Sequence, residues 1–414
     1  MSAHLPSNLR IDGDRLMDRL FRLGQVGALE GGGVCRLVLT DADKAGRNLV
    51  VGWMRDLGLE VSIDRIGNVV GIRPGEIDGP PVMTGSHIDT VATGGLYDGN
   101  LGVLAGLEVV ETLNDAGVTT RHPLAVGFFT NEEGARFAPD MMGSGVHQGQ
   151  LALDDCLAVR GIDGTTVGEE LQRIGYAGDA PVGGFRVRTF VELHVEQGPV
   201  LEEEGTEIAA VTGVQGISWT EYSIAGISNH AGTTPMRLRH DAGYVAAAIA
   251  THARRIAREM GGDQVGTSGV IELESNLINV IARRAKVTVD LRNTDEAKLQ
   301  EAERRMSARV AELEREEGVK IAARTLARFR PVDFDPAMVE RVAAVAEALG
   351  HSVRRMPSGA GHDAQMFASN CPTAMIFVPS KGGISHNVRE HTAPKEIAAG
   401  ANVLLQVLLS VASE

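Results

Sequence analysis

The sequence predicts an α/β protein whose mostly parallel sheet is interrupted by a second, inserted α+β domain. The chain has 414 residues, which is more than one ordinary hydrophobic core accommodates. In its first and last parts, short apolar runs alternate with stretches of helical periodicity, which favours parallel strands joined by helices. The middle follows the order β-α-β-β-α-β, which is the ferredoxin-like arrangement.

The outer parts supply the elements of the parallel sheet. Apolar residues spaced by three and four predict helices, and short apolar or alternating runs predict strands. In order, we expect helices at 10–25 and 40–57, strands at 61–72 (broken by Gly67) and 81–84, a helix at 101–113, strands at 124–129 and 190–195, a helix at 335–349, a strand at 374–378 and a last helix from Pro394.

The middle part gives the inserted domain. Its expected elements are strand 217–225, helix 240–260, strands 266–273 and 286–291, the highly charged helix 296–316 and strand 319–324. We therefore predict a first part of the main domain at 1–212, an inserted domain at 213–328 and a second part at 329–414. The hinges are expected near Gly213 and Pro331.

Charge and composition exclude several classes of protein. The formal net charge of −14 repels phosphate backbones, so nucleic acid is not an expected partner. The apolar run Val403–Ala412 is too short to cross a bilayer, and the N-terminus lacks a signal pattern, so we expect no membrane association. The three cysteines show no CxxC spacing, which argues against a disulfide framework and favours a cytoplasmic location.

Polar residues of the metal-ligand type follow four of the predicted strands. Ligands of open α/β sheets bind beyond the carboxyl ends of the strands, so these loops can converge on one crevice. The residues are His87, Asp89 and Asp98 after strand 81–84, Glu132 and Glu133 after strand 124–129, His194 within strand 190–195, and His386 after strand 374–378.

Each of these residues alone has a simpler interpretation. A single histidine in a loop is usually a hydrogen-bonded surface residue, and Asp98-Gly99 is a common turn. The argument rests on their coincidence at strand ends. Imidazoles and carboxylates without thiolates favour a catalytic zinc, manganese, cobalt or nickel site. The order of Glu132 and Glu133 leaves open which is a ligand and which is a base.

Seven motifs together resemble the amidase, hydantoinase/carbamoylase family, which is related to the dinuclear-zinc aminopeptidases. That family includes N-carbamoyl-L-amino-acid hydrolases, allantoate amidohydrolases and β-ureidopropionases. The resemblance runs from about residue 10 to the C-terminus. The motifs are GSHIDT, GGLYDGNLGVLAGLE, NEEGARF, ELHVEQGP, HAGTTPM, SGAGHDAQ and GGISHN.

The resemblance implies a site for two divalent metal ions. It makes Asp98 the bridge between them, with His87 and His194 on one ion and Glu133 and His386 on the other. It makes Asp89 the carboxylate that fixes the tautomer of His87. Glu132 becomes the general base.

The resemblance also assigns residues that act on the substrate. His230, in the HAGTTPM motif, would donate to the developing oxyanion from the partner subunit of a homodimer; without the resemblance we would take it for a turn cap. Arg292 and Asn279 would bind the substrate carboxylate and reach the partner's site. On the sequence alone, an ion pair of Arg292 with Asp290 or Asp295 is a fair rival. Further contacts are implied for Gln197, Gly359 and Ala360.

His362 and Asp363 are interpreted as structural, with Asp363 capping a helix. Asn100 is taken for a variable position.

The expected function is hydrolysis of the carbamoyl C–N bond of an N-carbamoyl-L-amino acid, with allantoate or a β-ureido acid as alternatives. A dipeptidase or N-acyl deacylase on the same metal site is less favoured by the motifs. A non-catalytic carboxylate-binding protein would have lost a ligand or the base, and the sequence retains them all.

Overall fold

The computed structural model describes residues 9–184 and 186–414, which form two compact units. Of the described residues, 9–184, 186–212 and 333–414 form one unit, and the continuous segment 213–332 forms the other. The second unit therefore begins where the sequence predicts an insertion. It ends later than the predicted residue 328, which lies inside strand β11 (Lys320–Phe329).

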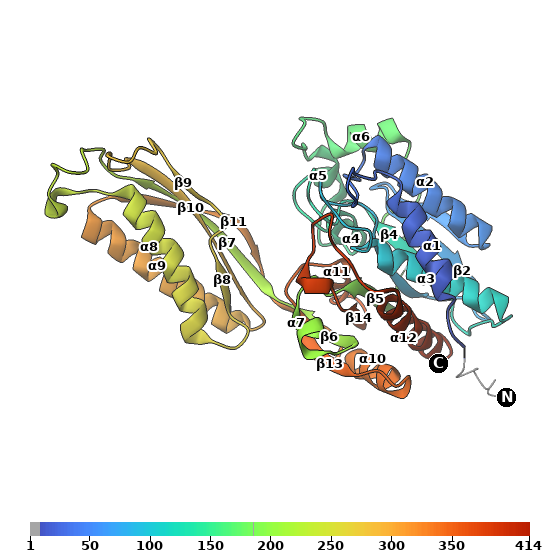
Figure 1. The fold of residues 1–414 in the computed structure, drawn as a ribbon. Coiled ribbons are helices and arrows are strands. Elements are labelled where there is room, and N and C mark those ends of the chain that lie inside the picture. Colours follow the sequence, from blue (N-terminus) through green and yellow to red (C-terminus); the bar gives the residue numbers. More distant parts are fainter. Residues whose placement is uncertain (1–8, 185) are drawn as a thin grey trace. The chain divides into compact units, whose positions relative to one another are not determined.

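The first unit is an α/β unit (Figure 1). Before the insertion it contains α1 (Gly13–Gly24), α2 (Asp41–Asp56), β1 (Glu60–Ile63), β2 (Val69–Arg73), β3 (Val82–His87), α3 (Asn100–Asp115), β4 (Leu124–Phe129), α4 (Met142–His147), α5 (Leu153–Ala158), α6 (Val167–Ile174), β5 (Thr189–Val195), α7 (Val200–Glu204) and β6 (Ile208–Val214). After the insertion come β12 (Val332–Asp333), α10 (Pro336–Ala348), β13 (Val353–Ser358), α11 (Asp363–Phe367), β14 (Thr373–Val378), η2 (Lys381–Gly383) and α12 (Pro394–Ala412).

The sheet of this unit has the strand order β1-β2-β4-β3-β5-β14-β6-β12, with β13 also paired to β6. The central pairs β4–β3, β3–β5 and β5–β14 are parallel, and every residue of these four strands is buried. Strand β6, which the sequence analysis did not predict, pairs antiparallel with β14. The four parallel strands end at one edge of the sheet.

Helices cover both faces of this sheet. Phe190 of β5 stacks on Phe367 of α11 with ring centroids 3.9 Å apart. Leu193, three residues later, lies against Gly400 of α12, where an added Cβ would come within 2.8 Å of it. Because side chains alternate along a strand, residues three apart point to opposite faces.

Helix α12 is long and apolar enough to cross a membrane by length and composition alone. In this structure 67% of its most apolar window is buried, where it packs on α3, α10 and β14. It is the last helix that the sequence predicts from Pro394.

The second unit contains β7 (Gly216–Ala225), η1 (Met236–Leu238), α8 (Ala242–Met260), β8 (Val265–Thr267), β9 (Ile271–Leu273), β10 (Arg284–Asn293), α9 (Glu296–Glu317) and β11. Its sheet has the order β11-β7-β10-β8, with β9 also on β10, and all neighbours are antiparallel. This is the order of a ferredoxin-like unit. The expected strand 266–273 is two short strands.

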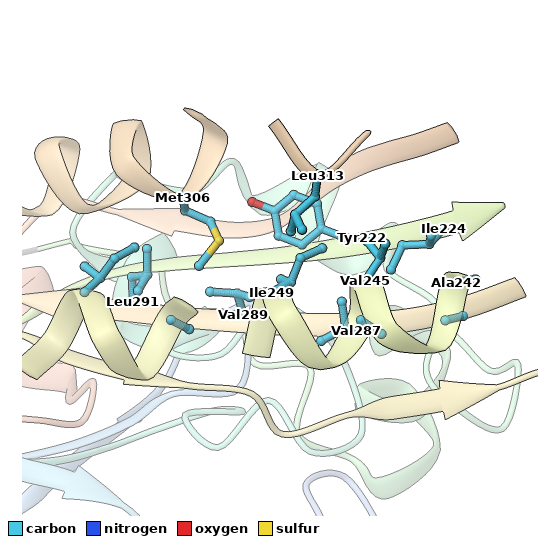
Figure 2. Close-up of a cluster of buried hydrophobic side chains, with 14 of the residues drawn as sticks. Tyr222, Ile224, Ala242, Val245, Ile249, Val287, Val289, Leu291, Met306 and Leu313 are labelled. Atoms are coloured by element: carbon cyan, nitrogen blue, oxygen red, sulfur yellow. The ribbon is translucent and has the colours of Figure 1, made fainter. Parts of the chain in front are cut away.

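One face of this sheet packs against α8 and α9 to form a separate apolar core (Figure 2). Val287, Val289 and Leu291 alternate inward from β10, while Val245 and Ile249 face them from α8. Asp241 and Asp295 cap the two helices by accepting backbone N–H bonds in the first turn. The unit therefore has its own core and its own helix caps.

Candidate metal centre

The strand register brings the predicted donors together at the carboxyl edge of the parallel strands. Phe129 pairs with His87 across β4 and β3, and Phe377 pairs with His194 across β14 and β5. Thr84 pairs with Val191, and continuing this register along β3 and β5 places His87 opposite His194. The loops after β3, β4 and β14 supply the remaining donors.

The first group of donors consists of His87, Asp98 and His194. Asp98 Oδ1 lies 3.6 Å from His87 Nε2 and 3.1 Å from His194 Nε2. All three side chains are buried. Gly99 follows with φ +66°, and a Cβ at this position would overlap the His87 ring, so only glycine permits this approach.

The second group consists of Asp98, Glu133 and His386. His386 Nε2 lies 3.5 Å from Asp98 Oδ2 and 3.2 Å from Glu133 Oε2. Asp98 thus directs one oxygen to each group. His386 has φ +52°, an uncommon backbone conformation for a residue with a side chain, which is typical of functional sites.

These donors fit two divalent ions. Two atoms that each lie about 2.0–2.1 Å from one tetrahedral zinc are roughly 3.3 Å apart, and the donor separations of 3.1–3.6 Å bracket that value. Asp98 directs one carboxylate oxygen to each donor group, so it is suited to bridge two metal ions. The absence of thiolates among these donors fits zinc, manganese, cobalt or nickel.

The electrostatics of the site favour a cation. Burial acts to lower the pKa of His87, but the charge of Glu132 and the hydrogen bond with Asp98 raise it well above its usual value. The pKa of His386 is raised to about 9, mainly by its hydrogen bond with Glu133. Burial acts to raise the pKa of Asp98, yet its bonds with His194 and His87 hold it well below the usual range. The site thus concentrates negative charge.

The adjacent glutamates occupy different positions. Glu133 belongs to the second donor group, whereas Glu132 Oε2 lies 3.3 Å from His87 Nε2 and belongs to neither group. Burial raises the pKa of Glu132 well above its usual value, which makes this carboxylate a better proton acceptor. Asn131, directly before them, has φ +61° and donates its amide to the backbone carbonyls of Phe137 and Pro139, which fixes the turn.

Asp89 supports the site differently from the expectation. His87 Nδ1 is hydrogen-bonded to the backbone carbonyl of Asp89, which accepts at 2.9 Å, and not to the Asp89 carboxylate. The carboxylate instead accepts the backbone N–H groups of Glu132 and Glu133 at 3.4 and 3.3 Å. The Asp89 side chain thus contacts the loop after β4, while its backbone contacts the His87 ring.

A third group, Glu192, His194 and His362, also lies within ligand distance. Its other two members already have partners, because Glu192 accepts from the Ser86 hydroxyl at 2.6 Å and from Ala364 N–H at 2.8 Å. His362 Nε2 lies 2.9 Å from Ser358 Oγ. We therefore assign this group to the structure of the loop around α11.

The expected cap of α11 is wrong by one residue. His362 occupies the N-cap position, and Asp363 is the first helical residue. The Asp363 side chain is fully buried, and burial raises its pKa to about 8.

Three further substrate contacts are predicted, at Gln197, Gly359 and Ala360, and Gln197 contacts a donor. Gln197 has φ +60° and donates its amide to Asp98 Oδ2 at 2.9 Å. Gly359 and Ala360 lie in the loop between β13 and α11, where Ala360 N–H donates to Ser358 Oγ. The next histidine of this loop, His362, has its ring centroid 4.5 Å from that of His194.

His230 and Asn279 lie together in the second unit. Ala231 N–H donates to the Asn279 carbonyl at 2.9 Å, and His230 bridges to Val280. His230 Nδ1 accepts the N–H groups of Gly232 and Thr233 at 3.0 and 3.2 Å, so the neutral ring carries its proton on Nε2. The histidine caps its turn and leaves an exposed donor.

Arg292 lies at the opposite end of the same sheet. It pairs with Ile217 near the link to the first unit, whereas Arg284 at the other end of β10 pairs with Ala225. At about 3.4 Å per residue, the strand separates these ends by roughly 27 Å. The guanidinium forms an ion pair with Asp290 at 2.9 Å and lies over the Trp219 ring at 5.7 Å.

Sequence reasoning missed several residues that position the ligands. Arg36 is fully buried and donates to the backbone carbonyl of Ile88 and to Asn100 Oδ1. Asn100, which is expected to be a variable position, accepts this buried hydrogen bond. Glu390 accepts backbone N–H bonds from the loop that carries Asp98. A lone arginine or glutamate in a loop gives no periodic signal that could have marked them.

Comparisons with known proteins identify the family of the chain. Residues 83–410 match the peptidase family M20/M25/M40. The chain is 42% identical to an N-carbamoyl-L-amino-acid amidohydrolase of Rhizobium meliloti, over 98% of each chain. It is 32% identical to an allantoate amidohydrolase of Bacillus subtilis, over 96% of this chain and 97% of the relative. A crystal structure of an amidase of the hydantoinase/carbamoylase family from Burkholderia multivorans superimposes with a TM-score of 0.95, at 46% identity over 98% of this chain and 99% of that one.

Proposed function

Because the chain belongs to the peptidase family M20/M25/M40 and is an amidohydrolase, we propose that it hydrolyses the carbamoyl C–N bond of an N-carbamoyl-L-amino acid. The products are the amino acid, carbon dioxide and ammonia. The observation that carries the proposal is Asp98, whose two oxygens serve two donor groups while Glu132 remains outside both. His87 and His194 would hold one divalent ion, and Glu133 and His386 the other.

The reaction needs a nucleophile, a base and stabilisation of the oxyanion. Two divalent ions, when bound, would lower the pKa of a water molecule and polarise the carbamoyl group. Glu132 accepts the proton of the attacking water at its carboxylate and delivers it to the leaving nitrogen of the amino acid. Asp89 holds the Glu132 backbone in place. The carbamate that leaves decomposes to carbon dioxide and ammonia.

His230 would donate to the oxyanion from its Nε2 proton, since Nδ1 already accepts two backbone N–H groups. Arg292 would bind the substrate carboxylate in bidentate fashion, exchanging its bond with Asp290 for the substrate. Asn279, Gln197, Gly359 and Ala360 would add polar contacts.

The length of β10 changes which subunit of a homodimer is expected to supply each substrate-binding residue. One sheet is not suited to supply His230, Asn279 and Arg292 to a single small substrate. Arg292 lies roughly 27 Å along β10 from Arg284, and the loops that carry His230 and Asn279 join the sheet at the Arg284 end. We propose that His230 and Asn279 come from one subunit and Arg292 from the other. This replaces the expectation that all three reach the partner's site.

Substrate assays test the proposal. Purified protein is incubated with N-carbamoyl-L-methionine, N-carbamoyl-β-alanine, allantoate or a dipeptide, each with added zinc or manganese, and ammonia and free amine are measured. Release of ammonia from N-carbamoyl-L-methionine at the highest kcat/KM is expected. Preference for allantoate would favour the allantoate branch, to which one relative belongs. Amine release from the dipeptide alone would show peptide hydrolysis in place of ureido hydrolysis and would contradict the proposal.

Metal analysis separates the enzyme from a carboxylate-binding protein. Two equivalents of divalent metal per chain support the proposal, and no bound metal with no ureido hydrolysis contradicts it. The three cysteines are free thiols, which is consistent with the proposed cytoplasmic location.

A further inference from the structure

A buried glutamate follows His386 in the same loop. Glu390 is 4% exposed, and its Oε1 accepts the backbone N–H groups of Tyr97 at 3.0 Å and of Asp98 at 3.1 Å. These two amides precede α3, and Asp98 is the carboxylate shared by both donor groups. The glutamate thus attaches the loop after β3 to the loop after β14.

The two loops are shaped for this close approach. A Cβ at Gly95 would overlap the Glu390 carboxylate, so the residue beside the glutamate must be glycine. The rings of Tyr97 and His391 meet edge to face with centroids 6.1 Å apart. Residues of both loops, the one after β3 and the one after β14, therefore contribute to this contact.

The same loop also holds the other end of Asp98. Ser385 Oγ donates to Asp98 Oδ2 at 3.2 Å, while Glu390 holds the backbone N–H of the same residue. A side chain that is bonded at its carboxylate and at its main chain has little rotational freedom. Preorganised ligands of this kind bind metal more tightly than mobile ones.

We propose that Glu390 is a positioning residue that fixes the bridging carboxylate Asp98 through the backbone N–H groups of Tyr97 and Asp98. The proposal rests on the proposed function only in that Asp98 is a metal ligand. It assigns Glu390 no contact with substrate or metal.

The hydrogen bonds of Glu390 allow its role as an acceptor to be tested separately from its negative charge. Both bonds go to Oε1, and Oε2 has no hydrogen-bond partner among the described residues. A glutamine keeps one oxygen at the same distance along the side chain, whereas alanine removes the acceptor and leaves two amides unpaired. Glu390→Gln should therefore keep the hydrogen bonds to the two amides, and Glu390→Ala should lose them.

The first measurement needs no metal. Amide hydrogen exchange of the peptide that contains Tyr97 and Asp98 is followed in metal-free protein. The second is zinc affinity, from competition with a chromogenic chelator. The matched control is Glu396→Ala, which removes a carboxylate that accepts the N–H of Ala393 at 3.0 Å at the start of α12.

Glu390→Ala should accelerate exchange of this peptide and weaken zinc binding by roughly tenfold or more, the range for residues that orient metal ligands. Glu390→Gln and Glu396→Ala should stay close to the wild type in both measurements. Wild-type exchange and zinc affinity in Glu390→Ala would overturn the proposal, as would equal losses in Glu390→Gln. If Glu390→Ala does not fold, Glu390→Asp, which cannot reach both amides, replaces it.

The two arms distinguish this proposal from the proposed function. A wild-type protein that binds no zinc contradicts the metal centre, and the exchange arm then still decides whether Glu390 holds the loop. A wild-type protein that binds zinc, with unchanged exchange in Glu390→Ala, contradicts the role of Glu390 alone.

Discussion

The two units hold their polar residues in different ways. In the first unit, Asp98, His87 and His194 are buried, and their possible ligand atoms all lie within 4.8 Å of one another. In the second unit, His230 and Asn279 are exposed, and Arg292 is bonded to its own neighbour Asp290. The proposed metal ligands are thus fixed at the buried edge of a sheet, whereas the proposed substrate contacts His230 and Asn279 lie on an exposed surface. The first unit therefore carries all the donors of both groups, whereas the proposed substrate contacts His230, Asn279 and Arg292 belong to the second unit.

The largest effect is expected from the residue that joins the donor groups. Asp98→Ala removes the only carboxylate that the two groups share, so both ions should be lost and turnover should fall below detection. Elemental analysis and the ureido assay measure this. Full metal content in Asp98→Ala would show that the two groups are independent.

The adjacent glutamates should separate chemistry from metal binding. Glu132→Gln should reduce kcat by roughly 100-fold or more while metal remains bound, because general acid–base groups contribute that much. Glu133→Gln should instead lose metal, since Glu133 belongs to the second donor group. A metal-depleted Glu132→Gln protein would reverse the two assignments.

Mixed dimers test whether the residues of the second unit act in different sites. Alone, His230→Ala should lower kcat by roughly 10²–10³, as the loss of one oxyanion donor does. When His230→Ala and Arg292→Ala chains are unfolded and refolded together, activity should recover, because one site of each hybrid then has both residues intact. If both residues came from the same partner, neither site of a hybrid would be complete and activity would not return.

Arg292 should affect substrate binding more than folding. Arg292→Ala should raise KM for carboxylate substrates by roughly 10–100-fold, the equivalent of about 1.5–3 kcal/mol for a charged hydrogen bond. Arg284→Ala, at the other end of the same strand, is the matched control and should leave KM unchanged. Equal KM values for the wild type and Arg292→Ala would remove this residue from the site.

The smallest effect on the metal centre should come from the core of the second unit. Met306→Ala deletes a side chain that is 1% exposed, and such deletions cost about 2–5 kcal/mol of stability. Thermal unfolding should show an earlier transition for this unit, while metal stoichiometry stays at the wild-type value. A parallel loss of metal would show that the two cores are coupled.

Much of the fold follows from local pattern. Strand β4 has the predicted bounds, 124–129. A short apolar run between turn residues is typical of a fully buried strand. The short helices α4 to α7 and strand β6 were not predicted, since their helices have six, six, eight and five residues and give little periodic signal.

The sequence by itself determined which residue types follow each strand, because hydrophobic periodicity and glycine-rich loops are local properties. It thereby marked His87, Asp98, Glu133, His194 and His386 as candidate donors. Only the tertiary structure decided how they meet: the parallel register sets His87 beside His194, and Asp98 divides its oxygens between two groups. The partners of Asp89, the separation of Arg292 from His230 and the bonds of Glu390 also depend on contacts between segments far apart in the chain. Such contacts depend on how distant segments pack and which strands pair, and the periodicity of a single segment does not specify its partners.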